Sequence, residues 1–462
     1  VFSGAFLYET FRSYGSYRSK FVIAQKTDTT APSARKSHIG IVYSILMVLL
    51  LLVLFLLSPA NKVYASVVLT AVLVIATGLF GREELDETKM SLPMILCLFG
   101  LAGSILLTMA ISPYSMRDLF IDTSFLLLTV LFFYCIRPSS FEISPFMKRV
   151  FYCLALAVVL VSVFRRDAET PYYVFGSYDK NYFGVVLFLF FCWCWYEKRK
   201  LGVAVCVVAA LVLNSRGYQM MLLCFALINA VIWIRARRKG SVSQPSRSVH
   251  PVVLFLLFAL MFFSIVTFSW WWSTAVVGGD TVSASLASRG LNDTSNAIRF
   301  NSNLYAIEQI SKDPLLIFRG YDIDIRRVMN IGNPFGDKDT LLASASLHGY
   351  RVVQPHHAVI NLLLKHGVLY TIFYFAVFSI VIAPYARKET AGVWVPFFLV
   401  GMVMHSTMTS HYLLFFVFVL ATSAHDQGFC CADASRAAKK LEKSPNQRVV
   451  RRRVVSRKGA FI

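Results

Sequence analysis

The sequence predicts an all-α, polytopic membrane protein with about twelve transmembrane helices and one large outer loop, periplasmic or extracellular, between spans nine and ten. Three observations lead to this fold class: the composition, the length of the apolar runs and the distribution of charge. Of the 462 residues, 56% are hydrophobic, 15% are aromatic and only 15% are charged, and the mean hydropathy is +0.60. A chain with so few charges is not a set of ordinary soluble domains.

The apolar runs give the positions of the expected spans. About 17 or more apolar residues are needed to cross roughly 30 Å of hydrocarbon at about 1.5 Å per residue. A polar leader of 38 residues precedes the first run and is too long for a cleaved signal peptide, so we expect that run to be a retained anchor. Spans are expected near residues 39–58, 62–80, 91–111, 119–136, 148–164, 181–196, 200–214, 217–235, 251–272, 367–386, 391–405 and 411–425.

The charge distribution orients these spans. The net charge of +21 and the pI of 9.7 first suggest a nucleic-acid binder. However, the leader, the tail and the alternate short loops hold 31 of the 46 Lys and Arg residues and a net charge of about +19. The segments near 165–180 and 273–355, on the other side, each sum to zero. The positive-inside rule therefore predicts two cytoplasmic termini, and it argues against a nucleic-acid partner.

These observations divide the chain into five parts. We expect a basic cytoplasmic leader over 1–38, transmembrane helices one to nine over 39–272, and an outer loop with active-site helices over 273–366. Transmembrane helices ten to twelve follow over 367–425, and a basic cytoplasmic tail over 426–462. A loop as long as the outer one is usually functional. Its apolar residues Ile298, Leu304, Ile307 and Ile310 have helical spacing up to Asp313-Pro314, which predicts a helix lying on the membrane surface.

Two polar segments interrupt the apolar pattern on the outer side. One is Asn214-Ser-Arg-Gly-Tyr218, where Arg216 would cost free energy in hydrocarbon and is therefore expected to face a wet cavity or an anion. The other runs from Gln354 to Gly367 and contains His356, His357 and His366. If it is helical from His356, positions 356, 360, 363 and 367 share one face.

These residue types favour chemistry on a lipid diphosphate. The planar guanidinium group of arginine pairs with two phosphate oxygens at once, and a neutral histidine can accept a proton from a hydroxyl group. The opposing class, a transporter, would show ionisable residues and broken helices at matching places within two halves of the chain. The few ionisable residues in spans, Asp122, Lys365, His405 and His411, cluster near the outer edge and favour an enzyme. The arginines that could bind a diphosphate are Arg216, Arg289, Arg299, Arg319 and Arg351.

Three stretches, in this order, resemble the bacterial O-antigen ligase and O-antigen polymerase superfamily of integral-membrane glycosyltransferases. Asn214-Ser-Arg-Gly217 is similar to its Ser-Arg-Gly turn, and Arg299 followed by Asp313-Pro314 and Arg319-Gly320 is similar to its Arg…Pro-Leu-x-Gly-x-Gly stretch. His356-His-Ala-Val-Ile360 with Gly367 resembles its His-Asn-x-x-Leu…Gly motif at the same spacing. Asp179-Lys-Asn-Tyr-Phe-Gly184 is a weaker match, and the resemblance covers about residues 175–425.

The resemblance implies a metal-independent, inverting transfer that needs no cofactor. Arg216 and Arg299 would bind the diphosphate and His356 would activate the acceptor hydroxyl. The chain departs from the family where His357 replaces the usual Asn and Lys365 stands at a commonly acidic position. These departures leave the base open between His356 and His357, although the spacing to Gly367 favours His356. Further candidate site residues are Arg289, Arg319, Arg351, His357 and Asn181.

The function expected from the resemblance is cell-surface polysaccharide assembly in the bacterial inner membrane. The donor would be an undecaprenyl-diphosphate-linked oligosaccharide, and the acceptor another lipid-linked repeat for a polymerase, which we favour, lipid A core for a ligase, or a protein hydroxyl for a related oligosaccharyltransferase. Membrane lipids, a chain-length regulator and a flippase would be its partners. A polysaccharide or lipid transporter is the alternative from a different class.

Overall fold

The computed structural model describes residues 90–111, 116–136, 145–164, 180–213, 215–239, 248–272, 309–319, 357–403 and 411–426. It also describes the single positions 45, 49, 64, 65, 68, 72, 75, 303, 306, 307 and 408. All of them belong to the second of two compact units, His38–Ile462. The regular structure among these residues is helical, with no strand, so the predicted all-α class is confirmed for the described part of the chain.

The helices coincide with the apolar runs of the sequence from residue 91 onward. The count of about twelve spans stays a prediction, because the runs near 39–58 and 62–80 lie almost entirely outside the described residues. The helices are α5 (Leu92–Ile111), α6 (Met116–Ile136), α7 (Pro145–Phe164), α8 (Lys180–Tyr196), α9 (Lys200–Leu213), α10 (Arg216–Lys239), α11 (Pro251–Trp272), α14 (Leu316–Arg319), α17 (Ala358–Ile382), α18 (Ala391–Val403) and α19 (His411–Asp426).

Four segments are long and apolar enough to cross a membrane: Leu92–Ile111, Arg216–Arg235, Pro251–Phe268 and Ala358–Ile382. In the first three, only 12–22% of the residues are buried inside the protein, and apolar side chains such as Phe99 and Phe263 are exposed. Apolar surface left uncovered on this scale is the surface that lipid covers. These helices are therefore those of a chain built to enter a membrane, and α5, α10 and α11 carry apolar faces that a bilayer would cover.

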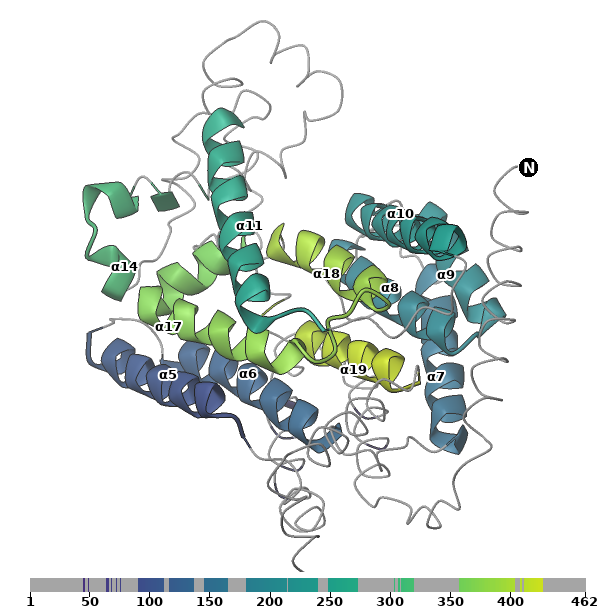
Figure 1. The fold of residues 1–462 in the computed structure, drawn as a ribbon, viewed down its shortest axis with the longest axis horizontal. Helices are drawn as coiled ribbons and strands as arrows, with labels where there is room; N and C mark the ends of the chain where they lie inside the picture. The colour runs from purple at the N-terminus through teal and green to yellow at the C-terminus, as the bar shows by residue number, and fades with distance from the viewer. Residues whose placement is uncertain are drawn as a thin grey trace, which may run out of the picture. The chain divides into compact units, whose positions relative to one another are not determined.

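Helix α17 is the exception, because 61% of its span is buried. It packs against α5 and α6 on one side and against α11 and α14 on the other, as Figure 1 shows. Helices α8, α9, α10, α18 and α19 contact one another beside it. Since α17 is buried by protein, polar side chains along it are protected from lipid and can be tolerated within the membrane.

The contacts between helices define one end of this bundle. Gly392 at the start of α18 lies against Asn229 and Phe225 in α10, whereas Gly217 at the start of α10 lies against Val400 near the end of α18. Thus α10 and α18 are antiparallel. The loop from α17 to α18 also receives a hydrogen bond from the Val249 N–H, just before α11, to the Ala386 carbonyl (2.8 Å). The middle of α10, the end of α17 and the starts of α11 and α18 therefore lie together.

A single non-helical residue, Gly367, interrupts α17, and we call this interruption the break. Gly367 has φ 83° and ψ 172°, a conformation outside the helix that side chains with a Cβ rarely adopt. The sequence predicts the tenth span from 367, but helical structure begins at Ala358 and continues beyond the break. The predicted face through positions 360, 363 and 367 is therefore interrupted at Gly367, and position 356 lies outside the described residues. Hydroxyl groups satisfy the carbonyl oxygens at the break: Thr108 donates to His366 (2.9 Å) and Thr371 to Gly367 (2.9 Å).

We predict that Gly367→Ala destabilises the protein by about 1–3 kcal/mol, because a Cβ makes the positive-φ conformation strained. Thermal unfolding of the detergent-purified protein measures the effect. Gly103→Ala in α5 is the matched control, since a Cβ there meets nothing within 4 Å. Equal melting temperatures for Gly367→Ala and the control would show that the break is not required.

Candidate functional site

Two of the polar motifs pack directly against each other. Gly184, at the end of the Asp179–Gly184 motif in α8, lies so close to the start of α10 that an added Cβ would meet Tyr218 Cβ at 2.8 Å and Ser215 Oγ at 3.1 Å. Asn181 lies one turn earlier, in the first turn of α8. Only a residue without a side chain allows the two helix starts to approach this closely. The Asp179–Gly184 stretch is the weaker match to the family, yet the close packing of α8 against α10 explains why it ends in a glycine.

The start of α10 is fixed by its own side chains. The buried Ser215 hydroxyl accepts a hydrogen bond from the Tyr218 N–H (3.4 Å), as at a helix N-cap. The Tyr218 hydroxyl donates to the Cys206 carbonyl (2.8 Å) and the Gln219 amide to the Ala210 carbonyl (3.1 Å), both in α9. Arg216 is consequently the first residue of α10, and its side chain is exposed. The Ser-Arg-Gly turn is therefore a cap that presents an arginine.

The start of α17 has a histidine at its cap. His357 is 1% exposed, has extended backbone, and its Nδ1 accepts the Ile360 N–H at 3.5 Å. Its ring lies beside Phe262 of α11, with centroids 6.2 Å apart. Burial lowers the pKa of His357 to about 3. Among the described residues, its Nε2 has no hydrogen-bond partner.

Part of the predicted surface helix packs on this region. Ala306 and Ile310 contact Ile360 and Leu364 of α17, together with Phe262 and Val266 of α11. Helical backbone ends at Lys312, and Asp313 turns the chain by accepting the Leu315 N–H (3.1 Å) and the Leu316 N–H (3.0 Å). Asn303, one turn before Ala306, is 1% exposed and its Oδ1 has no partner within the described part of the chain. The segment therefore covers the first turns of α17.

Arg216 is the first residue of α10, and His357 caps the start of α17. The start of α10 lies beside Val400 near the end of α18, whereas the start of α17 lies beside Phe262 of α11. Arg319 is the last residue of α14. The predicted residues His356, Arg289, Arg299 and Arg351 lie outside the described residues.

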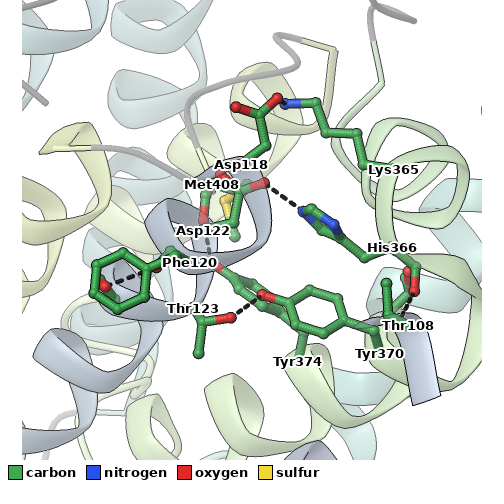
Figure 2. A network of polar contacts seen from close by, with 12 residues as sticks. Thr108, Asp118, Phe120, Asp122, Thr123, Lys365, His366, Tyr370, Tyr374 and Met408 are labelled. Atoms are coloured by element: carbon green, nitrogen blue, oxygen red, sulfur yellow. Dashed lines mark hydrogen bonds and ion pairs between the residues drawn. The ribbon is translucent and has the colours of Figure 1, made fainter. Parts of the chain in front are cut away.

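A buried polar network joins α6 to α17 at the backbone break, as Figure 2 shows. The His366 Nε2 lies 2.8 Å from Asp122 Oδ2, and both side chains are at most 6% exposed. The His366 ring packs edge-on against Tyr370 (centroids 4.7 Å apart), and the Tyr370 hydroxyl lies 3.1 Å from Thr123 Oγ1. The Tyr374 hydroxyl donates to the Met408 carbonyl (2.6 Å). An ionisable pair buried at a break in a span is a functional candidate by itself.

One turn away, Lys365 Nζ lies 3.7 Å from Asp118 Oδ2, in a more exposed ion pair between the same two helices. The unusual lysine at position 365 thus has an acidic partner in α6. The sequence marks Asp122, Lys365 and His366 as ionisable residues in or beside spans, but it does not predict their pairing. The spacing Asp118 to Asp122 and the adjacent Lys365-His366 are the signal, since residues four apart share a helix face. No group of His, Cys, Asp or Glu suited to a metal occurs among the described residues.

Comparisons with known proteins add no assignment. No family model matches the chain, and neither the curated proteins nor the solved structures include a significant match to it. The function must therefore be argued from the residues themselves.

We predict that Asp122→Ala lowers the free energy of unfolding by about 1–3 kcal/mol, because His366 is then left buried without its partner. Asp118→Ala, one turn earlier on the same helix, removes only a half-exposed ion-pair partner and should cost about 0–1 kcal/mol. Denaturation of both variants in the same detergent compares them. Equal losses would contradict a special contribution from the buried pair.

Proposed function

We propose that the protein is a membrane glycosyltransferase that moves a glycan from undecaprenyl diphosphate to an acceptor hydroxyl. The observation that carries the proposal is the exposed Arg216 at the first position of α10, where this helix packs against the start of α8. An exposed cation at the head of a membrane helix suits a lipid-linked diphosphate, whose lipid can lie along the apolar faces of the neighbouring helices. The resemblance of the polar motifs to the O-antigen ligase and polymerase superfamily supports the same donor.

The proposed reaction is one displacement. The acceptor oxygen forms a bond to the anomeric carbon while the bond from that carbon to the diphosphate oxygen breaks. The electron pair leaves with the diphosphate, whose charge Arg216 and Arg299 would neutralise, and the hydroxyl proton passes to His356. Attack opposite to the leaving group inverts the anomeric configuration. His357 is a poor candidate for this base, because burial lowers its pKa to about 3.

We favour a repeat-unit polymerase, with a ligase that uses lipid A core as the alternative within this class. The proposed location is the bacterial inner membrane with both termini cytoplasmic, since the basic residues gather in the leader, the tail and alternate loops. This orientation puts Arg216 and His357 on the outer face, where lipid-linked glycans are joined. A flippase and a chain-length regulator would be partners in the same process.

Deletion of the gene, with gel analysis of the surface polysaccharide, tests the proposal. We expect loss of long chains with one repeat still attached for a polymerase, and accumulation of lipid-linked long chains for a ligase. Arg216→Ala, Arg299→Ala and His356→Ala should each fail to restore the polysaccharide, with transfer rates lowered about a hundredfold or more.

The control is Arg235→Ala, which removes an exposed arginine near the opposite end of α10. It should restore the polysaccharide at normal protein levels. Full activity of the Arg216 and His356 variants would overturn the proposed mechanism. Unchanged polysaccharide after deletion of the gene would overturn the proposed function.

A proton-coupled transporter of lipid or polysaccharide is the second candidate. The Asp122–His366 pair favours it, because a buried carboxylate and imidazole at a break in a membrane helix can exchange a proton with a passing substrate. The groups that face the pair are Thr108 of α5, Thr123 of α6 and Tyr370 of α17. Lys365 and Asp118 lie one turn away.

Reconstituted liposomes separate the two candidates. If the protein is a transporter, a lipid-linked glycan should change the internal pH reported by a trapped dye, and Asp122→Asn should abolish the change while Asp118→Asn retains it. For a glycosyltransferase we expect no pH change in liposomes that nevertheless form longer glycans. A pH change that is equal in the Asp122→Asn variant would exclude the pair as the proton site.

A further inference from the structure

The further inference concerns His357, whose two ring nitrogens have different surroundings. Nδ1 accepts the backbone N–H of Ile360 and so completes the first turn of α17. A nitrogen that accepts this hydrogen bond carries no proton, so the proton of the neutral ring is on Nε2. That nitrogen is buried, and no hydrogen-bond partner for it occurs in the described part of the chain. Within the described residues, the ring therefore holds a buried N–H donor without an acceptor.

Binding of a second proton to the His357 ring is unfavourable. A second proton would have to bind Nδ1, which would break the hydrogen bond from Ile360 and place a positive charge at the positive end of the helix dipole. The aromatic ring of Phe262 beside it offers no carboxylate. Burial lowers the pKa to about 3, which agrees with these contacts. At neutral pH the ring is a donor with a fixed tautomer.

A buried donor without a partner costs free energy that a ligand oxygen can recover. The unsatisfied group costs about 1–3 kcal/mol, and pairing it with an anionic oxygen gives a stronger bond than pairing it with a neutral one. A neutral histidine at a helix N-terminus is suited to donating to an oxygen that carries or develops negative charge.

We propose that His357 is a substrate-binding residue whose Nε2–H donates a hydrogen bond to a phosphate oxygen of the lipid-linked donor. This rests on the proposed function for the identity of the ligand. It assigns the two adjacent histidines different tasks: His357 binds an oxygen as an uncharged donor, and the proton acceptor of the reaction is a different group. The usual Asn of the related family motif fits the same role, because an Asn side chain can cap a helix and has an N–H donor.

Three uncharged substitutions of His357 separate its role as a helix cap from its role as a hydrogen-bond donor. His357→Ser keeps a capping oxygen but is too short to place a donor at the position of Nε2, whereas His357→Gln keeps an N–H donor at similar reach and caps poorly. His357→Ala loses both. We expect the melting temperature to fall for Gln and Ala but not for Ser, and the affinity for undecaprenyl diphosphate to fall about tenfold for Ser and Ala but less for Gln. If Ser binds the lipid as tightly as the native protein, the donor role is wrong.

Nitrogen-15 NMR of the histidine-labelled full chain in lipid nanodiscs tests the tautomer directly. The chain has nine histidines, and the difference from His357→Gln identifies the resonances of His357. We expect a protonated Nε2 and an unprotonated Nδ1 that do not change between pH 5.5 and pH 8. Undecaprenyl diphosphate without a glycan should then shift the Nε2 resonance, whereas free oligosaccharide should not.

These outcomes do not depend on whether sugar transfer occurs. A protonated Nδ1, titration near pH 6 to 7, or no response to undecaprenyl diphosphate would overturn the inference even if the protein is a glycosyltransferase. A response to free oligosaccharide alone would overturn the phosphate assignment. Conversely, a fixed Nε2–H that responds to undecaprenyl diphosphate would uphold the inference in a protein that shows no transfer activity.

Discussion

The arrangement of the bundle depends on one constraint, the interruption of α17 at Gly367 inside a buried membrane helix. Backbone groups freed within a bilayer have no water to pair with, so other parts of the protein must satisfy them. Thr108 and Thr371 do so at the carbonyl oxygens of His366 and Gly367, and Asp122 binds the His366 ring. These bonds require α5 and α6 to lie directly against α17. The central position of α17 is thus a condition for having a break at all.

The break also separates the roles of the two parts of α17. The residues before it carry the cap histidine and contact the segment around Ala306, whereas those after it pack among aromatic residues such as Phe258 of α11. Because the Asp122–His366 bond holds the short first part next to α6, the position of His357 depends on a contact about two and a half turns away along the helix. A substitution at Asp122 can therefore shift the start of α17 through the loss of its hydrogen bond to His366.

The sequence was sufficient for those features that depend on local composition. Apolar runs gave the helices from residue 91 onward, since length and hydropathy decide whether a segment crosses a membrane. The start of α17 does not follow from the apolar run, which begins where polar residues stop at Gly367, because burial by α5, α6 and α11 allows His366 and Asn361 inside the helix. The pairing of Asp122 with His366 could not be predicted from the sequence either, because the contact joins residues far apart in the chain.

The choice between the adjacent histidines shows what geometry adds to a motif. The departures from the family motif leave both His356 and His357 as candidates for the base, although the spacing to Gly367 favours His356. The Ile360 N–H bond removes the lone pair that His357 would need for proton acceptance and leaves its proton on the buried nitrogen. A base must have a free lone pair and a donor must have a proton, so one hydrogen bond to the backbone is enough to exclude His357 from the first task and suit it to the second.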